Sequence, residues 1–205
     1  MISNLEYKRQ LFHLVFGIIL ALLIYYNLIN AYILLGIVIL GIIGSFLIKQ
    51  KYISPMHWSV PVVHWFLKHC ERDEDLHSFP GRASIYYLLG CIVTLAFFEK
   101  HIALAGIMIL ALGDSVSHVI GQFYGKYRHP LNSRKLIEGW IAGIIAGFLG
   151  AIIFVNGEEA FFASLIAMTA ESIEWGVDKR ILDDNFFIPI IAGVTITIIR
   201  LFHFF

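Results

Sequence analysis

Charged side chains are scarce in this 205-residue chain: they make up 15% of it, while hydrophobic residues make up 59%. An average soluble domain has roughly 25% charged residues. Together with a mean hydropathy of +0.78, this composition excludes a soluble globular domain, a disordered chain and a fibrous protein. The formal net charge is zero, so no nucleic-acid partner is expected. The two cysteines, Cys70 and Cys91, are too few for a disulfide framework, and we expect both to be reduced.

Long uncharged runs are present instead. The run from Gln10 to Ile48 contains no Asp, Glu, Lys or Arg. We expect this run to be too long for a cleavable signal peptide or for one bilayer crossing of about 20 residues. Asn27 and Asn30 interrupt this run and predict a tight turn between two helices. Five more apolar segments follow, at Ala83–Phe98, Ile102–Phe123, Gly139–Val155, Ala160–Trp175 and Phe186–Phe202. The sequence therefore predicts an all-α, polytopic membrane bundle of about seven transmembrane helices, forming a single domain over residues 1–205.

The basic residues predict the orientation of this bundle. With seven crossings the loops alternate between two sides, and all 15 Lys and Arg residues except Lys100 and Arg200 fall on one side. Since basic residues favour cytoplasmic loops, we expect the N-terminus in the cytoplasm and the C-terminus outside.

One apolar segment, Ile53–His69, does not fit the pattern of a membrane span. Pro55 and Pro61 break it, while Trp58 and Trp65 share one helical face. We expect a short interfacial helix there, within a cytoplasmic loop over residues 53–82.

Acidic residues inside apolar segments are costly and usually serve a function. Asp114 lies within the fourth segment, and Glu171 and Glu174 lie near the cytoplasmic end of the sixth. A helix-end side chain that reaches water is the alternative explanation, above all for Glu174.

Three loops on the predicted cytoplasmic side place polar groups at a helix start, where free N–H groups favour anions. They are residues 77–82, 132–139 and 183–185. Helix capping alone would not explain the adjacent acids Asp183 and Asp184 beside an apolar helix. Acids and cations at one membrane face suit Mg²⁺ and a nucleotide, although the chain has no Walker A, protein-kinase or dinucleotide-binding signature.

Six motifs, in this order, resemble those of the CTP-dependent polyprenol kinase family, which includes dolichol kinases, phytol kinases and yeast-type diacylglycerol kinases. They are Glu6-x2-Arg9-x3-His13-x3-Gly17, Gly81-Arg82, Gly113-Asp114-x6-Gly121-x3-Gly125, Lys135-x2-Glu138-Gly139, Glu171, and Asp183-Asp184-Asn185-x3-Pro189. Two positions depart from the family pattern: Gln10 stands where a Lys usually follows Arg9, and Leu136 stands where a Ser is common.

The resemblance implies a lipid kinase that transfers the γ-phosphoryl group of CTP to the hydroxyl of a long-chain isoprenoid alcohol, such as dolichol, polyprenol or phytol. The enzyme would be a multi-pass protein of the cell membrane with its active site facing the cytoplasm. The implied residue roles are as follows: Asp114 and Asp184 bind Mg²⁺; Lys135, Arg82 and Arg9 contact phosphates; Glu138 binds the metal or ribose; Gly121, Gly139 and Asn185 belong to the nucleotide site; and either Glu171 or His13 accepts the alcohol proton.

Two other functions stay open at this level. A CTP-dependent lipid cytidylyltransferase also needs Mg²⁺, CTP and a membrane alcohol derivative, but the motif order fits the kinase better. A transporter or metal-handling protein is suggested by the nine histidines, although His57, His64 and His69 are spaced loosely for a metal site. The acids also gather at one face instead of crossing the bilayer. The chain length of the alcohol and the oligomeric state, a homodimer included, are open as well.

Overall fold

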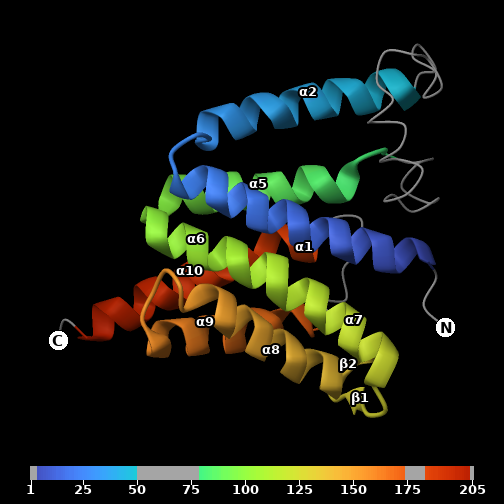
Figure 1. Ribbon diagram of the computed structural model, residues 1–205, viewed down its shortest axis with the longest axis vertical. Coiled ribbons are helices and arrows are strands. Elements are labelled where there is room, and N and C mark those ends of the chain that lie inside the picture. The colour runs from blue at the N-terminus through green and yellow to red at the C-terminus, as the bar shows by residue number, and fades with distance from the viewer. Residues whose placement is uncertain (1–3, 50–78, 174–182, 204–205) are drawn as a thin grey trace.

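The computed structural model describes residues 4–49, 79–173 and 183–203, which form a bundle of helices and one two-stranded hairpin (Figure 1). The helices are α1 (Asn4–Tyr25), α2 (Ala31–Lys49), α5 (Arg82–Phe97), α6 (Lys100–Met108), the π-helix η1 (Ile109–Asp114), α7 (Ser115–Tyr124), α8 (Ile137–Ala151), α9 (Gly157–Glu171) and α10 (Asp184–His203). The strands are β1 (Arg128–His129) and β2 (Asn132–Leu136). The predicted all-α class is confirmed. The expected interfacial helix at 53–69, its three histidines, Cys70 and Glu174 lie outside the described residues.

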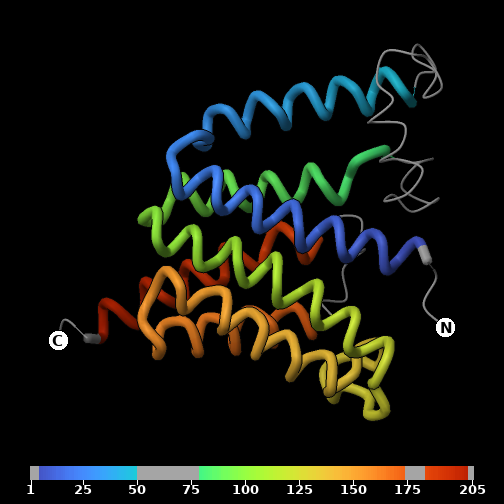
Figure 2. Tube along the Cα trace, viewed as in Figure 1, coloured from blue at the N-terminus to red at the C-terminus, as the bar shows by residue number. Residues whose placement is uncertain are grey.

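Each of the seven predicted apolar segments contains a helix. Within the described ranges, four helical stretches are long and apolar enough to span a membrane: Leu5–Tyr25, Ala31–Lys49, Lys100–Tyr124 and Asp184–Phe202. Arg82–Phe97 and Ile137–Ala151 are apolar but shorter. Helix α1 begins and α10 ends at opposite ends of the bundle (Figure 2).

The turn predicted at Asn27 and Asn30 connects α1 and α2. Asn27 adopts a left-handed conformation with φ of 58°, which asparagine tolerates better than most residues. The ammonium of Lys100 donates to the Tyr25 carbonyl at 2.8 Å and to Asn27 Oδ1 at 2.7 Å, which fixes the turn against the start of α6. Helix α2 then packs mainly on α5, at the edge of the bundle (Figure 1).

The centre of the bundle is one continuous rod formed by α6, η1 and α7. It contacts α1, α8 and α10, and it is the most deeply buried of the four candidate spans. Leu104, Ile107 and Leu110 on this rod are completely buried. The rod contains a π-helical segment that ends at Asp114, and such segments are rare and frequent at functional sites.

Glycines allow the helices beside the rod to approach it closely. A Cβ atom on Gly139 would lie 2.5 Å from the Ser117 carbonyl oxygen and 2.9 Å from the Cα of Gly121, so α8 touches the backbone of α7. A Cβ on Gly90 of α5 would lie 2.8 Å from the Asn185 carbonyl oxygen. These contacts set the positions of the first turns of α8 and α10, which flank the candidate site.

Candidate active site

Asp114 lies at the end of η1 with only 5% of its surface exposed, between two histidines. His118, one turn later on the same rod, places Nε2 at 3.4 Å from Oδ1 of Asp114. His13 on α1 places its Nε2 at 3.8 Å from Oδ2. The carboxylate is therefore enclosed by two imidazoles inside an apolar bundle.

Glu171 is the last residue of α9 and is 4% exposed. Its Oε1 forms an ion pair with the ammonium of Lys135 on β2. Its Oε2 is buried and has no hydrogen-bond partner among the described residues.

The ammonium of Lys135 also lies 3.8 Å from Oδ2 of Asp184, at the start of α10. Burial of Lys135 disfavours its charge, but the attraction of Glu171 and Asp184 outweighs burial and raises the pKa of Lys135 above its usual value. The two carboxylates therefore favour the charged form of Lys135.

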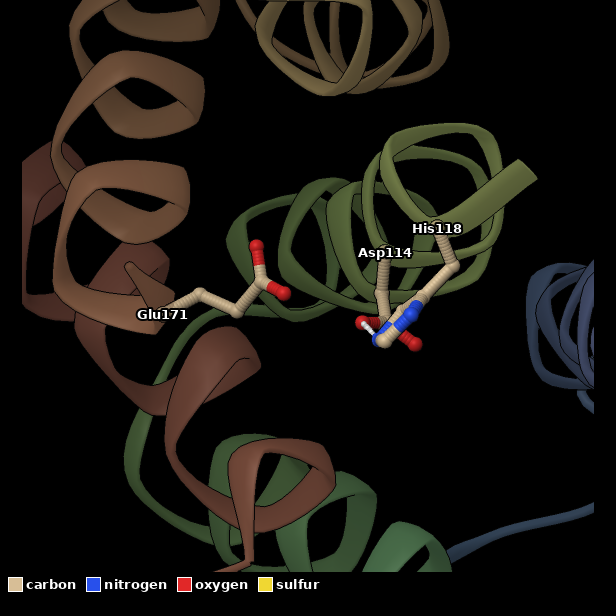
Figure 3. Close-up of side chains that lie close together, drawn as sticks. All are labelled: Asp114, His118 and Glu171. Atoms are coloured by element: carbon tan, nitrogen blue, oxygen red, sulfur yellow. Dashed lines mark ion pairs between the residues drawn. The ribbon is translucent and has the colours of Figure 1, made fainter. Parts of the chain in front are cut away.

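Asp114, His118 and Glu171 form a compact group that we call the Asp114 cluster. One potential ligand atom from each residue lies within 4.8 Å of the others. Figure 3 shows the carboxylate of Glu171 reaching from α9 towards the Asp114 and His118 side chains on the central rod. The central rod and α9, which are far apart in sequence, thus supply oxygen and nitrogen atoms to one place.

The β1–β2 hairpin that carries Lys135 was expected to be a loop. Asn132–Leu136 is mostly polar and lacks the apolar alternation that signals a strand. Glu138 holds the hairpin against α8, because its carboxylate accepts from the backbone N–H of Lys126 at 2.9 Å and of Tyr127 at 3.3 Å. A metal or ribose contact of Glu138 stays a prediction, as does a nucleotide contact of Gly121 and Gly139, which the structure places in a helix-packing contact.

The two predicted phosphate-binding arginines lie on α1 and α5. Arg9 forms an ion pair with Glu6, and its charge acts on Asp114. Arg82 follows Gly81, which has φ of 79°, and its guanidinium lies 6.0 Å from the centre of the Tyr86 ring.

The loop before α10 is shaped by Asp183, whose Oδ1 accepts from the Asn185 backbone N–H at 3.0 Å. Burial of Asp183 is the main cause that raises its pKa to about 6. The charge of Arg82 opposes this rise, so Arg82 lies within electrostatic reach of the loop.

Two residues of this region were missed by sequence reasoning. His118 follows Asp114 by four positions, and this helical spacing could have indicated it. Tyr87 sits in an apolar run that gives no such signal. Its ring packs edge-on against His13 with centroids 4.7 Å apart, and its buried hydroxyl has no hydrogen-bond partner in the described part of the chain.

The opposite end of the bundle carries a second charged group. Arg200 on α10 donates to Glu159 at 2.8 Å and to Glu99 at 2.8 Å. This group ties the end of α10 to the start of α9, and the two charged regions thus lie at different ends of the helices.

An apolar groove of 540 Å³ runs between α9 and α10. Its walls come from residues of the two helices that also carry Glu171 and Asp184. They include Phe162, Ile166, Ile190, Val194, Ile198 and Phe202.

Comparison with known proteins gives several relatives. The chain is 29% identical to an uncharacterized protein of Methanocaldococcus jannaschii over 93% of this chain and 92% of that protein. It is 27% identical to CTP-dependent diacylglycerol kinase 1 of Eremothecium gossypii, over 60% of this chain and 45% of the kinase. It is 29% identical to the phytol kinase of Synechocystis sp. over 38% of each chain. No family model and no solved structure matches the chain.

The region of similarity covers less than half the length of the two CTP-dependent diacylglycerol kinases, 45% of one and 49% of the other. Relatives named as CTP-dependent diacylglycerol kinases and phytol kinases confirm the resemblance that the six motifs indicated, and they support a CTP-dependent polyprenol or lipid kinase family for this chain.

Proposed function

We propose that this protein is a membrane lipid kinase that transfers the γ-phosphoryl group of CTP to the hydroxyl of a long-chain isoprenoid alcohol. The observation that carries the proposal is the convergence of Asp114, Lys135, Glu171 and Asp184, from four separate elements, at one end of an apolar bundle. Binding a metal-bound polyphosphate requires carboxylates that hold the metal and a positioned basic side chain, here Lys135, that contacts the phosphates. The named relatives support CTP as the donor and a lipid alcohol as the acceptor.

In this proposal the protein has seven crossings, with the N-terminus and the active site on the cytoplasmic side. CTP arrives from the water phase at the charged end of the bundle. Lys135 contacts the phosphates, since its ammonium already lies between two carboxylates and stays charged there. Arg9 and Arg82 contribute further positive charge from α1 and α5.

The side chains also fit the divalent cation that phosphoryl transfer uses. Asp114, Glu171 and Asp184 offer carboxylate oxygens, and Oε2 of Glu171 is buried without a hydrogen-bond partner within the described ranges. A bound cation would neutralise charge on the phosphate oxygens. Mg²⁺ is the cation that the family resemblance implies.

His13 is the better placed of the two candidates for accepting the alcohol proton. Its ring is hydrogen-bonded to the backbone of Leu110, while Nε2 has no such partner in the described structure. A neutral imidazole that donates through Nδ1 keeps a free lone pair on Nε2. Glu171, by contrast, already holds the ammonium of Lys135.

The hydrocarbon chain of the acceptor fits the groove between α9 and α10. The groove has the apolar walls and the size, 540 Å³, of a lipid-chain site. Ile190, at its inner end, lies six residues after Asp184, which is about 9 Å along a helix. An alcohol lying in the groove would extend towards the carboxylates of the site.

The experiment that tests this function uses purified protein in detergent with CTP labelled separately at the α and γ phosphates. A set of nucleoside triphosphates is crossed with isoprenoid alcohols and diacylglycerol. We expect only the γ label to enter the lipid, with CTP as the preferred donor. An α label in the lipid would identify a cytidylyltransferase, and uptake into proteoliposomes without CTP consumption would identify a transporter.

A further inference from the structure

We propose that Asp114, His118 and Glu171 form a divalent-cation site with one nitrogen ligand, and that this site prefers Mn²⁺ to Mg²⁺. The inference deepens the proposed kinase function, on which it rests for the role of the cation. None of the six sequence motifs includes His118, so only the structure identifies the nitrogen ligand.

The distances suit one ion. Ligand atoms that are 2.0–2.2 Å from a common metal lie roughly 3 to 4.4 Å apart. Nε2 of His118 and Oδ1 of Asp114 are 3.4 Å apart, and the three ligand atoms of the cluster lie within 4.8 Å of one another. A small side-chain rotation of Glu171 would therefore complete the site.

The surroundings of Glu171 also point to a bound cation. Its side chain is completely buried, its Oε2 has no hydrogen-bond partner in the described residues, and its carboxylate points at Asp114 and His118 (Figure 3). Leaving a buried carboxylate oxygen unsatisfied is costly. A cation between Glu171 and Asp114 would satisfy this oxygen without disturbing the ion pair of Oε1 with Lys135.

The helix fixes two of the three ligands in advance. Asp114 and His118 lie one turn apart on the most buried rod of the bundle, so their side chains share one face and need little ordering on binding. His13 faces the other oxygen of Asp114 at 3.8 Å and adds a further nitrogen nearby. The charges of Lys135 and Arg9 also reach Asp114 and limit the affinity for a free cation.

The ligand chemistry determines the preference. Mg²⁺ requires oxygen ligands in near-ideal octahedral geometry and keeps several of its waters. Carboxylates suit both Mg²⁺ and Mn²⁺, whereas imidazole suits first-row transition metals, the series to which Mn²⁺ belongs. A site of two carboxylates and one imidazole should therefore hold Mn²⁺ more tightly than Mg²⁺.

The test measures Mn²⁺ binding to the full chain in detergent, without nucleotide, from the loss of the electron paramagnetic resonance signal of free Mn²⁺. We expect one Mn²⁺ per chain, at least tenfold tighter binding of Mn²⁺ than of Mg²⁺ in competition, and nitrogen modulation of the bound Mn²⁺ signal. His118→Ala should weaken Mn²⁺ binding about 10- to 100-fold and reduce the preference over Mg²⁺. His101→Ala, which removes an exposed histidine at the start of α6, is the matched control and should change neither.

His118→Gln serves as a second variant if His118→Ala lowers the unfolding midpoint. Unchanged Mn²⁺ affinity in the His118 variants, or bound Mn²⁺ without nitrogen modulation, overturns the inference. The two proposals fail separately. CTP-dependent phosphorylation that needs only Mg²⁺ and is unaffected by His118→Ala would leave the kinase and remove this site. Nitrogen-bound Mn²⁺ without transfer from any nucleotide would keep the site and remove the kinase.

Discussion

Lys135 and Glu171, 36 positions apart in the sequence, form an ion pair inside the bundle that joins the β1–β2 hairpin to the end of α9. The side chain of Glu171 is completely buried and that of Lys135 is 19% exposed. Two charges removed from water in this way are tolerated because each is the partner of the other. The pair therefore links the stability of the protein to the position of the Lys135 ammonium, which we propose binds phosphate.

Replacing one member of this pair should destabilise the protein. Lys135→Met leaves a buried carboxylate without its counter-ion, and we expect a loss of about 3–5 kcal/mol in the free energy of unfolding. The double variant Lys135→Met/Glu171→Leu removes both charges and should recover much of this stability without activity. Thermal unfolding in detergent measures both effects. A single variant as stable as the wild type would show that the pair contributes nothing.

Asp114→Asn should leave a folded but nearly inactive protein. The substitution keeps the size of the side chain but removes the charge that the cation requires, and we expect a loss of about 100-fold or more in turnover. The matched control is Glu99→Gln, which neutralises an exposed acid at the opposite end of the bundle. Wild-type turnover of Asp114→Asn in excess Mg²⁺ would exclude a metal-binding role for Asp114.

Gly139→Ala should disturb the site through the backbone. Its Cβ would lie 2.5 Å from the Ser117 carbonyl oxygen, so α8 has to move away from α7 together with the hairpin that holds Lys135. We expect a destabilisation of about 1–3 kcal/mol and a lower kcat. Gly44→Ala in α2 is the control, because a Cβ there meets no atom within 4 Å. Equal effects of the two variants would contradict the close contact.

Filling the groove should impair long-chain acceptors selectively. Val194→Trp narrows the space between α9 and α10, so we expect a KM for a long isoprenoid alcohol raised about tenfold or more, with little change for CTP. Ile145→Trp on α8 adds the same bulk at an exposed position outside the groove and should leave both KM values unchanged. Equal KM values for the alcohol in the two variants would place its chain elsewhere.

The stability of the protein should fall on acidification through His129. Burial and the nearby charge of Lys135 lower the pKa of His129 below 6.5 in the folded state. Below pH 6.5 the unfolded chain therefore binds a proton that the folded chain resists, and stability is lost as the pH falls further. His129→Asn keeps an acceptor for the Leu131 backbone N–H and should show a smaller loss of unfolding midpoint between pH 7.5 and pH 5.5. Equal losses in both proteins would exclude this contribution.

The helices were predictable because their signals are local. The absence of charge from Gln10 to Ile48 and the asparagines at its centre predicted α1, the turn and α2 within a few residues. The β1–β2 hairpin was not predictable, because its strands are short and polar and are held by the carboxylate of Glu138.

The sequence by itself determined where the apolar helices lie and at which of their ends the acids and cations gather, since both depend only on residue order and helical spacing. Only the tertiary structure decided which of these groups meet. The pairing of Lys135 with Glu171, and the approach of Glu171 to Asp114 and His118, depend on how closely α7, α8 and α9 pack. That closeness is set by backbone contacts at glycines such as Gly139 and Gly143, between residues that no local pattern connects.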